Sequence, residues 1–138
     1  LNDIVKAQGL GRKDRDGCML VDPDSIRDIV PTGDLIEGHL SHFLPVEAAI
    51  VLRCHPKALE RRLKKKGWGA GKVRENLEAE AVDVIVVEAV AEGREVFQID
   101  TTNTTPTEVA DSVERIIKGE GDGFKRHIDF SEVVLSWY

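Results

Sequence analysis

The chain has 138 residues and a mass of 15.3 kDa, which suits a single domain and leaves no room for a second hydrophobic core. Apolar residues make up 41% of it and charged residues 32%, a globular mixture that excludes disordered, collagen-like and fibrous proteins. Its 19 basic and 25 acidic residues give a net charge of −6, so the composition carries no direct signal for nucleic-acid binding.

The apolar runs are too short for a membrane span. The longest, residues 48–52, falls far below the ~18 residues that a spanning helix needs. The first residues also lack the apolar stretch of a signal peptide. Cys18 and Cys54 fit neither a zinc-site spacing nor a disulfide framework. We therefore expect a soluble protein of the reducing cytoplasm, without a membrane partner.

The first half of the chain predicts one helix and two strands. Asp22 is a good N-cap and Pro23 suits the first position of a helix over residues 22–30. The inner face of this helix would consist of Ile26, Ile29 and Val30. Residues 35–37 and 48–52 are short segments that are apolar on both faces, which predicts strands of a parallel sheet covered by helices.

The second half alternates helices and a strand. In chain order we expect a helix over residues 56–66, a flexible connector over 67–71, a long helix over 72–91, a strand over 95–99 and a helix that opens at residue 105. Gly67 is a natural left-handed stop, and Thr105 with Glu108 forms a capping box. Strands separated by helices indicate an α/β fold with a mostly parallel sheet.

Polar residues follow three of these strands, and open parallel sheets bind ligands at this edge. The strand ends are residues 37–39, 53–55 and 100–102. Glu37 and His39 flank a glycine, and a carboxylate at such a position can hold Mg²⁺ through water. Two other interpretations are open. In one, Glu37 only caps a strand beside a surface His39. In the other, both join Asp34 and His42 in a metal cluster, although no fixed ligand spacing supports one.

A basic cluster, residues 61–66, precedes the glycine-rich connector, and basic residues resume at Lys72 and Arg74. A mobile, cation-rich segment that closes over a negatively charged substrate is typical of the lid of phosphoryl-transfer enzymes. The alternative is a solvated helix end whose cations balance the helix dipole.

Five stretches, read in chain order, carry a resemblance to a known family. They are residues 36–42 (IEGHLSH), 51–56 (VLRCHP), 66–68 (KGW), 72–81 (KVRENLEAEA) and 99–102 (IDTT). Together they are similar to the archaeal and nuclear adenylate kinases, P-loop kinases that also act in small-ribosomal-subunit assembly. The resemblance covers about residues 1–118 and leaves the tail, residues 119–138, without an assigned role.

The resemblance implies a P-loop fold of the nucleoside monophosphate kinase type, with ATP and AMP as substrates and Mg²⁺ accompanying ATP. It implies a region that binds the monophosphate over about residues 1–21 and a short lid over about residues 65–75. The site residues that it implies are Glu37 and His39 for catalysis, with Glu37 holding Mg²⁺ through water, Lys66 and Arg62 for ATP, and Asp3 and Lys6 for AMP.

The chain departs from the family in two respects. Lys66 stands where the lid usually has an arginine, and lysine can neither stack nor chelate as a guanidinium does. No Gly-x-x-x-x-Gly-Lys-[Ser/Thr] pattern occurs, so no loop cradles the β- and γ-phosphates of ATP. We therefore expect that this chain, which does not begin with Met, lacks the N-terminal strand, P-loop and first helix of the family and is inactive alone.

The expected reaction is ATP and AMP to two ADP, with ATPase activity and a role in ribosome biogenesis and rRNA processing as further properties of the family. Two alternatives are open. One is a different small-molecule P-loop kinase. The other is a non-catalytic assembly factor that binds a small-subunit ribosomal protein, for which an acidic chain is a suitable partner because ribosomal proteins are basic.

Overall fold

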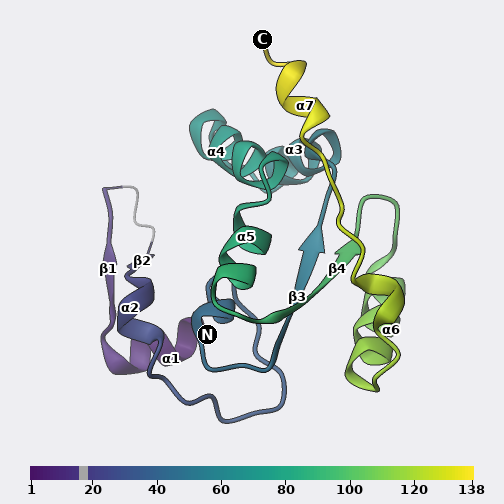
Figure 1. Ribbon diagram of the computed structural model, residues 1–138. Coiled ribbons are helices and arrows are strands. Elements are labelled where there is room, and N and C mark those ends of the chain that lie inside the picture. Colours follow the sequence, from purple (N-terminus) through teal and green to yellow (C-terminus); the bar gives the residue numbers. More distant parts are fainter. Residues whose placement is uncertain (16–18) are drawn as a thin grey trace.

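The computed structural model describes residues 1–15 and 19–138, so Cys18 lies outside the described residues. Its helices and strands form an N-terminal unit with a small hairpin and a larger unit around two parallel strands (Figure 1). In chain order they are α1 (Asn2–Gln8), β1 (Gly11–Lys13), β2 (Met19–Val21), α2 (Pro23–Ile26), β3 (Ala48–Arg53), α3 (Pro56–Lys65), α4 (Ala70–Ala81), α5 (Val84–Ala91), β4 (Glu95–Asp100), α6 (Pro106–Ile117) and α7 (Glu132–Leu135), with short 3₁₀ turns at Ser41–Phe43 and Asp122–Phe124.

The sheet that organises the larger unit consists of β3 and β4, which pair in parallel from Ala48 opposite Glu95 to Arg53 opposite Asp100. Helix α6 covers one face, where Ile116 is buried against Phe97 and Ile99. Helix α5 contacts both strands, and α3 and α4 stand beyond their carboxyl ends (Figure 1). The α/β fold with a parallel sheet flanked by helices is therefore confirmed.

The expected helix over residues 72–91 is wrong, because the chain breaks into α4 and α5. Asp83, between them, has φ 58°, and within the described residues it is the one non-glycine with positive φ. Its carboxylate accepts a hydrogen bond from Arg53 Nη2, so a contact with a distant strand interrupts a continuous helical pattern. The expected connector is also shorter, since α4 already begins at Ala70.

The expected strand over residues 35–37 does not form. These residues have no regular structure, and the side chain of Leu35 is 66% exposed. A strand needs a neighbouring backbone to pair with. In the described sheet β3 and β4 pair only with each other, so residues 35–37 have no described strand beside them. The expected helix over residues 22–30 is also too long, because α2 ends at Ile26 and the side chain of Val30 is 77% exposed rather than inward.

The guanidinium of Arg53, at the carboxyl end of β3, is the most connected polar group of the described structure, with the side chain 1% exposed. Nε donates to Glu80 Oε1 (2.8 Å), and Nη2 donates to the Glu80 carbonyl (3.2 Å) and to the Asp83 carboxylate. Nη1 donates to Gln98 Oε1 (2.6 Å) and to the carbonyl of Ile128 (2.8 Å). These partners compensate a charge that would be costly to bury alone.

We expect Arg53→Met to lower the free energy of unfolding by about 3–5 kcal/mol, because it leaves the carboxylates of Glu80 and Asp83 without their buried cation. Urea denaturation measures this loss. Arg61→Met is the matched control, since Arg61 is exposed on α3 and should change stability by no more than ~0.5 kcal/mol. Equal losses for the two variants would contradict the role assigned to Arg53.

Among the residues that the structure describes, no helix is both long enough and apolar enough to span a membrane.

Candidate functional site

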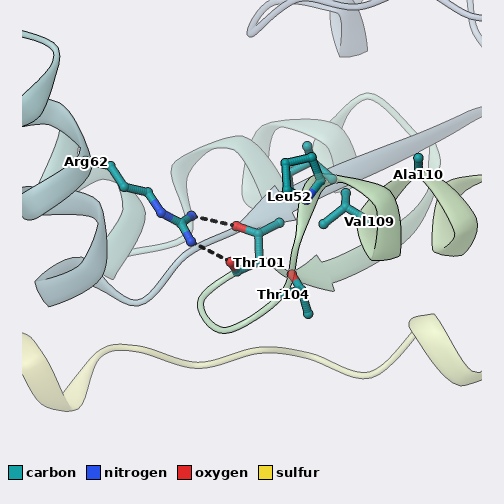
Figure 2. A pocket seen from close by; sticks show the side chains of 7 residues that line it. Leu52, Arg62, Thr101, Thr104, Val109 and Ala110 are labelled. Atoms are coloured by element: carbon teal, nitrogen blue, oxygen red, sulfur yellow. Dashed lines mark hydrogen bonds between the residues drawn. The ribbon is translucent and has the colours of Figure 1, made fainter.

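A pocket of about 540 Å³ opens where β3 and β4 end and α6 begins, as Figure 2 shows. Its lining combines an apolar floor with polar groups, and consists of Leu52, Arg62, Thr101, Thr104, Pro106, Val109 and Ala110. The side chain of Leu52 is 54% exposed although it lies on a strand of the central sheet. The carboxyl edge of parallel strands is the position where α/β sheets bind ligands.

The loop between β4 and α6 forms the polar wall of this pocket. Its first turn is fixed to β3, because the backbone N–H and the hydroxyl of Thr101 both donate to the Arg53 carbonyl (2.7 and 2.8 Å). Its last residue, Thr105, opens α6 with the capping box expected from the sequence, in which its hydroxyl accepts from the Glu108 N–H (3.2 Å). A loop tied at both ends can hold its hydroxyl groups in a fixed position.

Arg62 closes the pocket from the side of α3. Nη2 donates to the carbonyls of Thr101 (2.7 Å) and Thr102 (3.1 Å), and Nη1 donates to the Thr101 hydroxyl (3.2 Å). Nη1 also lies 3.2 Å from the sulfur of Cys54. The edge of the guanidinium that carries Nη1 and Nη2 is therefore engaged by the protein, and Figure 2 shows it pointing at Thr101 across the pocket mouth from Leu52 and Val109.

Two acidic groups, the buried thiol of Cys54 and the partly buried carboxyl of Glu80, lie behind this edge. Burial raises the pKa of the Cys54 thiol, and the positive charge of Arg62 opposes this shift. Burial also raises the pKa of the Glu80 carboxyl, against hydrogen bonds from the Cys54 N–H (3.0 Å) and from Arg53. Cys54 therefore holds its proton at neutral pH, which is typical of a packing cysteine.

The residues that the sequence nominated fall into two groups. Arg62 lies in the pocket, and Lys66 is exposed at the C-cap of α3. The other four are exposed and belong to the N-terminal unit, namely Asp3 and Lys6 on α1 and Glu37 and His39 in the loop before the 3₁₀ turn. The backbone nitrogen of Leu1 donates to the Glu37 carbonyl (3.1 Å). Figure 1 shows α1 and α6 on opposite sides of β3 and β4. The structure does not bring these two groups together.

The alternative of a metal cluster around Asp34, Glu37, His39 and His42 finds no support. Over residues 1–15 and 19–138 no group of three or more metal-ligating side chains converges. His42 is instead buried, with Nε2 2.9 Å from Glu88 Oε2. Sequence reasoning assigned no role to Arg53, Thr104 and Val109. For Arg53 the available signal was a charged residue that ends an apolar strand, and for Thr104 it was the threonine-rich run before α6.

Comparison with known proteins decides the family. A family model described as an AAA domain matches residues 17–83. A protein of Archaeoglobus fulgidus named "Putative adenylate kinase" is 42% identical over 125 residues, which cover 91% of this chain and 70% of the relative. Proteins of the same name from Natronomonas pharaonis and Pyrococcus abyssi are 41% and 38% identical, and each match covers 96% of this chain and 82% and 76% of the relatives, respectively. The chain belongs to this adenylate kinase family.

Membership of the adenylate kinase family confirms the resemblance found in the sequence and the P-loop kinase fold class, and it indicates a kinase-like protein that binds nucleotides. The matches extend past the tail's first residues, since the Natronomonas relative covers 96% of the chain.

We expect the thiol of Cys54 to ionise at higher pH than a free cysteine, whose pKa is about 8.5, because burial raises its pKa. The pH profile of iodoacetamide alkylation, measured in a Cys18→Ser background, should have its midpoint above that value. Arg62→Met should move the midpoint further up, since the guanidinium that favours the thiolate is removed. A midpoint that falls or stays constant in Arg62→Met would contradict the contact between Arg62 and Cys54.

Proposed function

We propose that this protein transfers the γ-phosphoryl group of ATP to AMP, with Mg²⁺, giving two ADP. The observation that carries the proposal is the pocket at the carboxyl end of β3 and β4, which Arg62 closes, in a chain whose relatives are named as adenylate kinases. Catalysis of this kind is mainly positioning and charge neutralisation, and the pocket supplies one cation, Arg62, at the end of a basic helix.

Arg62 would hold the base of ATP rather than its phosphates. Its terminal nitrogens already donate to Thr101 and Thr102, so they are engaged, whereas the flat face of a guanidinium stacks well on an aromatic ring. Leu52 and Val109 supply the apolar surface on which a purine would lie. The hydroxyl of Thr104 is the remaining polar group at this wall.

The phosphates would meet the lid, residues 65–75. Lys66 is exposed at the end of α3, and its N–H, not its side chain, donates to the carbonyls of Arg62 (3.2 Å) and Leu63 (3.1 Å). Among the described residues no carboxylate pairs with its ammonium group, whereas the neighbouring Lys64 pairs with Glu60. We assign Lys66 to the phosphates of ATP and Arg62 to the base.

Magnesium is expected with the nucleotide, in keeping with a kinase that binds Mg²⁺ through phosphates, waters and one or two carboxylates. We assign this water-mediated role to the exposed Glu37 on the resemblance alone, since the structure holds Glu37 and His39 in the N-terminal unit, apart from Arg62 and Lys66. When bound, the metal would neutralise charge on the transferred phosphoryl group. Asp3 and Lys6, both exposed on α1, are proposed to contact AMP.

We expect the 138-residue chain to show no measurable adenylate kinase activity, because it contains no Gly-x-x-x-x-Gly-Lys-[Ser/Thr] pattern to cradle the phosphates. An extended form, in which a segment carrying a P-loop precedes residue 1, should be active. The added segment contains no tryptophan, so that Trp68 and Trp137 can serve as fluorescent probes. A coupled ADP assay on both forms tests the difference. Comparable turnover by the 138-residue chain would overturn the requirement for the loop.

Lys66 gives the sharpest test of the lid in the extended form. Lys66→Arg supplies a planar fork for the phosphates, and one charge-assisted hydrogen bond is worth ~1.5–3 kcal/mol, so the KM for ATP should fall while the KM for AMP stays nearly constant. Lys66→Ala should raise the KM for ATP. The measurement is initial rate against ATP and AMP concentration.

Lys57→Ala is the matched control for Lys66→Ala, because Lys57 is an exposed cation at the opposite end of α3. It should leave the KM for ATP unchanged. If both Lys66 substitutions shift only the melting temperature, Lys66 serves the helix dipole, an effect of ~0.3–1 kcal/mol, and the lid assignment fails.

A ribosome-assembly role is the second candidate, and the net charge of −6 favours it because it complements a basic small-subunit ribosomal protein. In that case ATP hydrolysis would time release from the partner. Pull-down with such a protein, with and without ATP, distinguishes it from the kinase reaction. Profiling nucleoside monophosphates against other alcohols as acceptors distinguishes adenylate kinase from other P-loop kinases. Both roles assume a cytoplasmic protein, as the sequence predicts.

A further inference from the structure

The tail, residues 119–138, runs from the end of α6 across the carboxyl edge of the sheet to α3 and α4 (Figure 1). Gly121 is buried against the ring of Phe97 at its start. Farther along, Ile128 accepts a hydrogen bond from Arg53 Nη1 (2.8 Å), and the ring of Phe130 lies 5.2 Å from Arg53 Cζ. The tail is therefore anchored on the sheet before it reaches the two helices.

Beyond this anchor the tail ends on the base of the lid. Trp137 packs against the buried cluster that Leu63 of α3 forms with Val73 and Leu77 of α4. Together with polar side chains of α3 and α4 it lines a groove of about 330 Å³. Helices α3 and α4 carry the two ends of residues 65–75, so Trp137 lies where the two helices from which the lid extends pack together.

Trp137 also contacts a cation of the lid. The guanidinium carbon of Arg74 lies 5.3 Å from the centre of its ring, and Arg74 Nε donates to Glu78 Oε1 (2.6 Å). The second tryptophan, Trp68, lies inside the lid with Lys72 Nζ 4.2 Å from its ring centre. Two cations on the α4 side of the lid are thus each held on an aromatic face.

We propose that Trp137 is a positioning residue for the lid and holds α3 and α4 together at their base. Residues 65–75 then present their cations to ATP with little loss of conformational freedom on binding. This inference rests on the proposed function for its consequence in ATP binding, but not for its structural part. A restrained lid binds more tightly because less conformational entropy is lost when it closes.

The two tryptophans of the chain allow a direct test in the extended form. Trp137→Ala and Trp137→Phe both leave Trp68 as the single tryptophan, so its fluorescence reports ATP·Mg binding at the lid in each variant. Hydrogen exchange of the amides of residues 66–76 reports lid order without nucleotide. Leu135→Ala is the matched control, because this side chain of the same tail is 80% exposed.

We expect Trp137→Ala to raise the Kd for ATP about fivefold, equivalent to about 1 kcal/mol, and to speed exchange over residues 66–76 by a similar factor. Trp137→Phe should restore most of both effects, and Leu135→Ala should change neither. A Trp137→Ala variant that melts at lower temperature yet keeps the exchange rates and the Kd would overturn the inference. If no variant binds ATP, the proposed function fails, and exchange alone still decides the role of Trp137.

Discussion

The buried guanidinium of Arg53 is the constraint on which the rest of this structure depends. A cation with 1% of its side chain exposed must be compensated from every direction. The acceptors come from α4, from the residue between α4 and α5, from β4 and from the tail. No two of these parts are neighbours in the chain, apart from the end of α4 and Asp83. One side chain therefore fixes the mutual position of the sheet, the junction between α4 and α5, and the tail.

The same residue connects this interior network to the pocket. While its side chain faces Glu80 and Asp83, its main-chain carbonyl accepts the N–H and hydroxyl of Thr101, which begin the loop at the pocket wall. Glu80 also accepts the Cys54 N–H, and Cys54 in turn lies beside Arg62. A short path of hydrogen bonds thus connects α4 with Arg62 at the pocket. The position of Arg62 depends on contacts that a list of pocket-lining residues would not include.

Local patterns in the sequence predicted the elements that depend on local interactions. The capping box at Thr105 and Glu108, the left-handed stop at Gly67 and the apolar strand ending at Arg53 are all confirmed. The errors concern elements whose form depends on distant partners. The break at Asp83 follows from a contact with residue 53, and residues 35–37 have strand composition but no described backbone beside them. Hydrophobic periodicity cannot report either condition.

The site was predictable to a similar degree. Arg62 was identified from a resemblance, and it lies in the pocket. The roles of Glu37, His39, Asp3 and Lys6 stay predictions, because the described residues hold them in a separate unit. Thr104 and Val109 were not foreseen, since loop threonines and an ordinary valine of an amphipathic helix carry no chemical pattern of their own. Their relevance arises only when β3, α3 and α6 meet.

The left-handed conformation of Asp83 has a consequence for how this sequence can vary. Glycine would relieve the backbone, whose φ of 58° most side chains avoid, but it would remove a carboxylate from Arg53. Asparagine tolerates the same φ and keeps an acceptor oxygen, but it leaves the guanidinium with one less negative charge. Glutamate keeps the charge but lacks the short side chain that makes this conformation accessible. Position 83 therefore tolerates very few residue types. Substitutions there should be paired with changes at position 53.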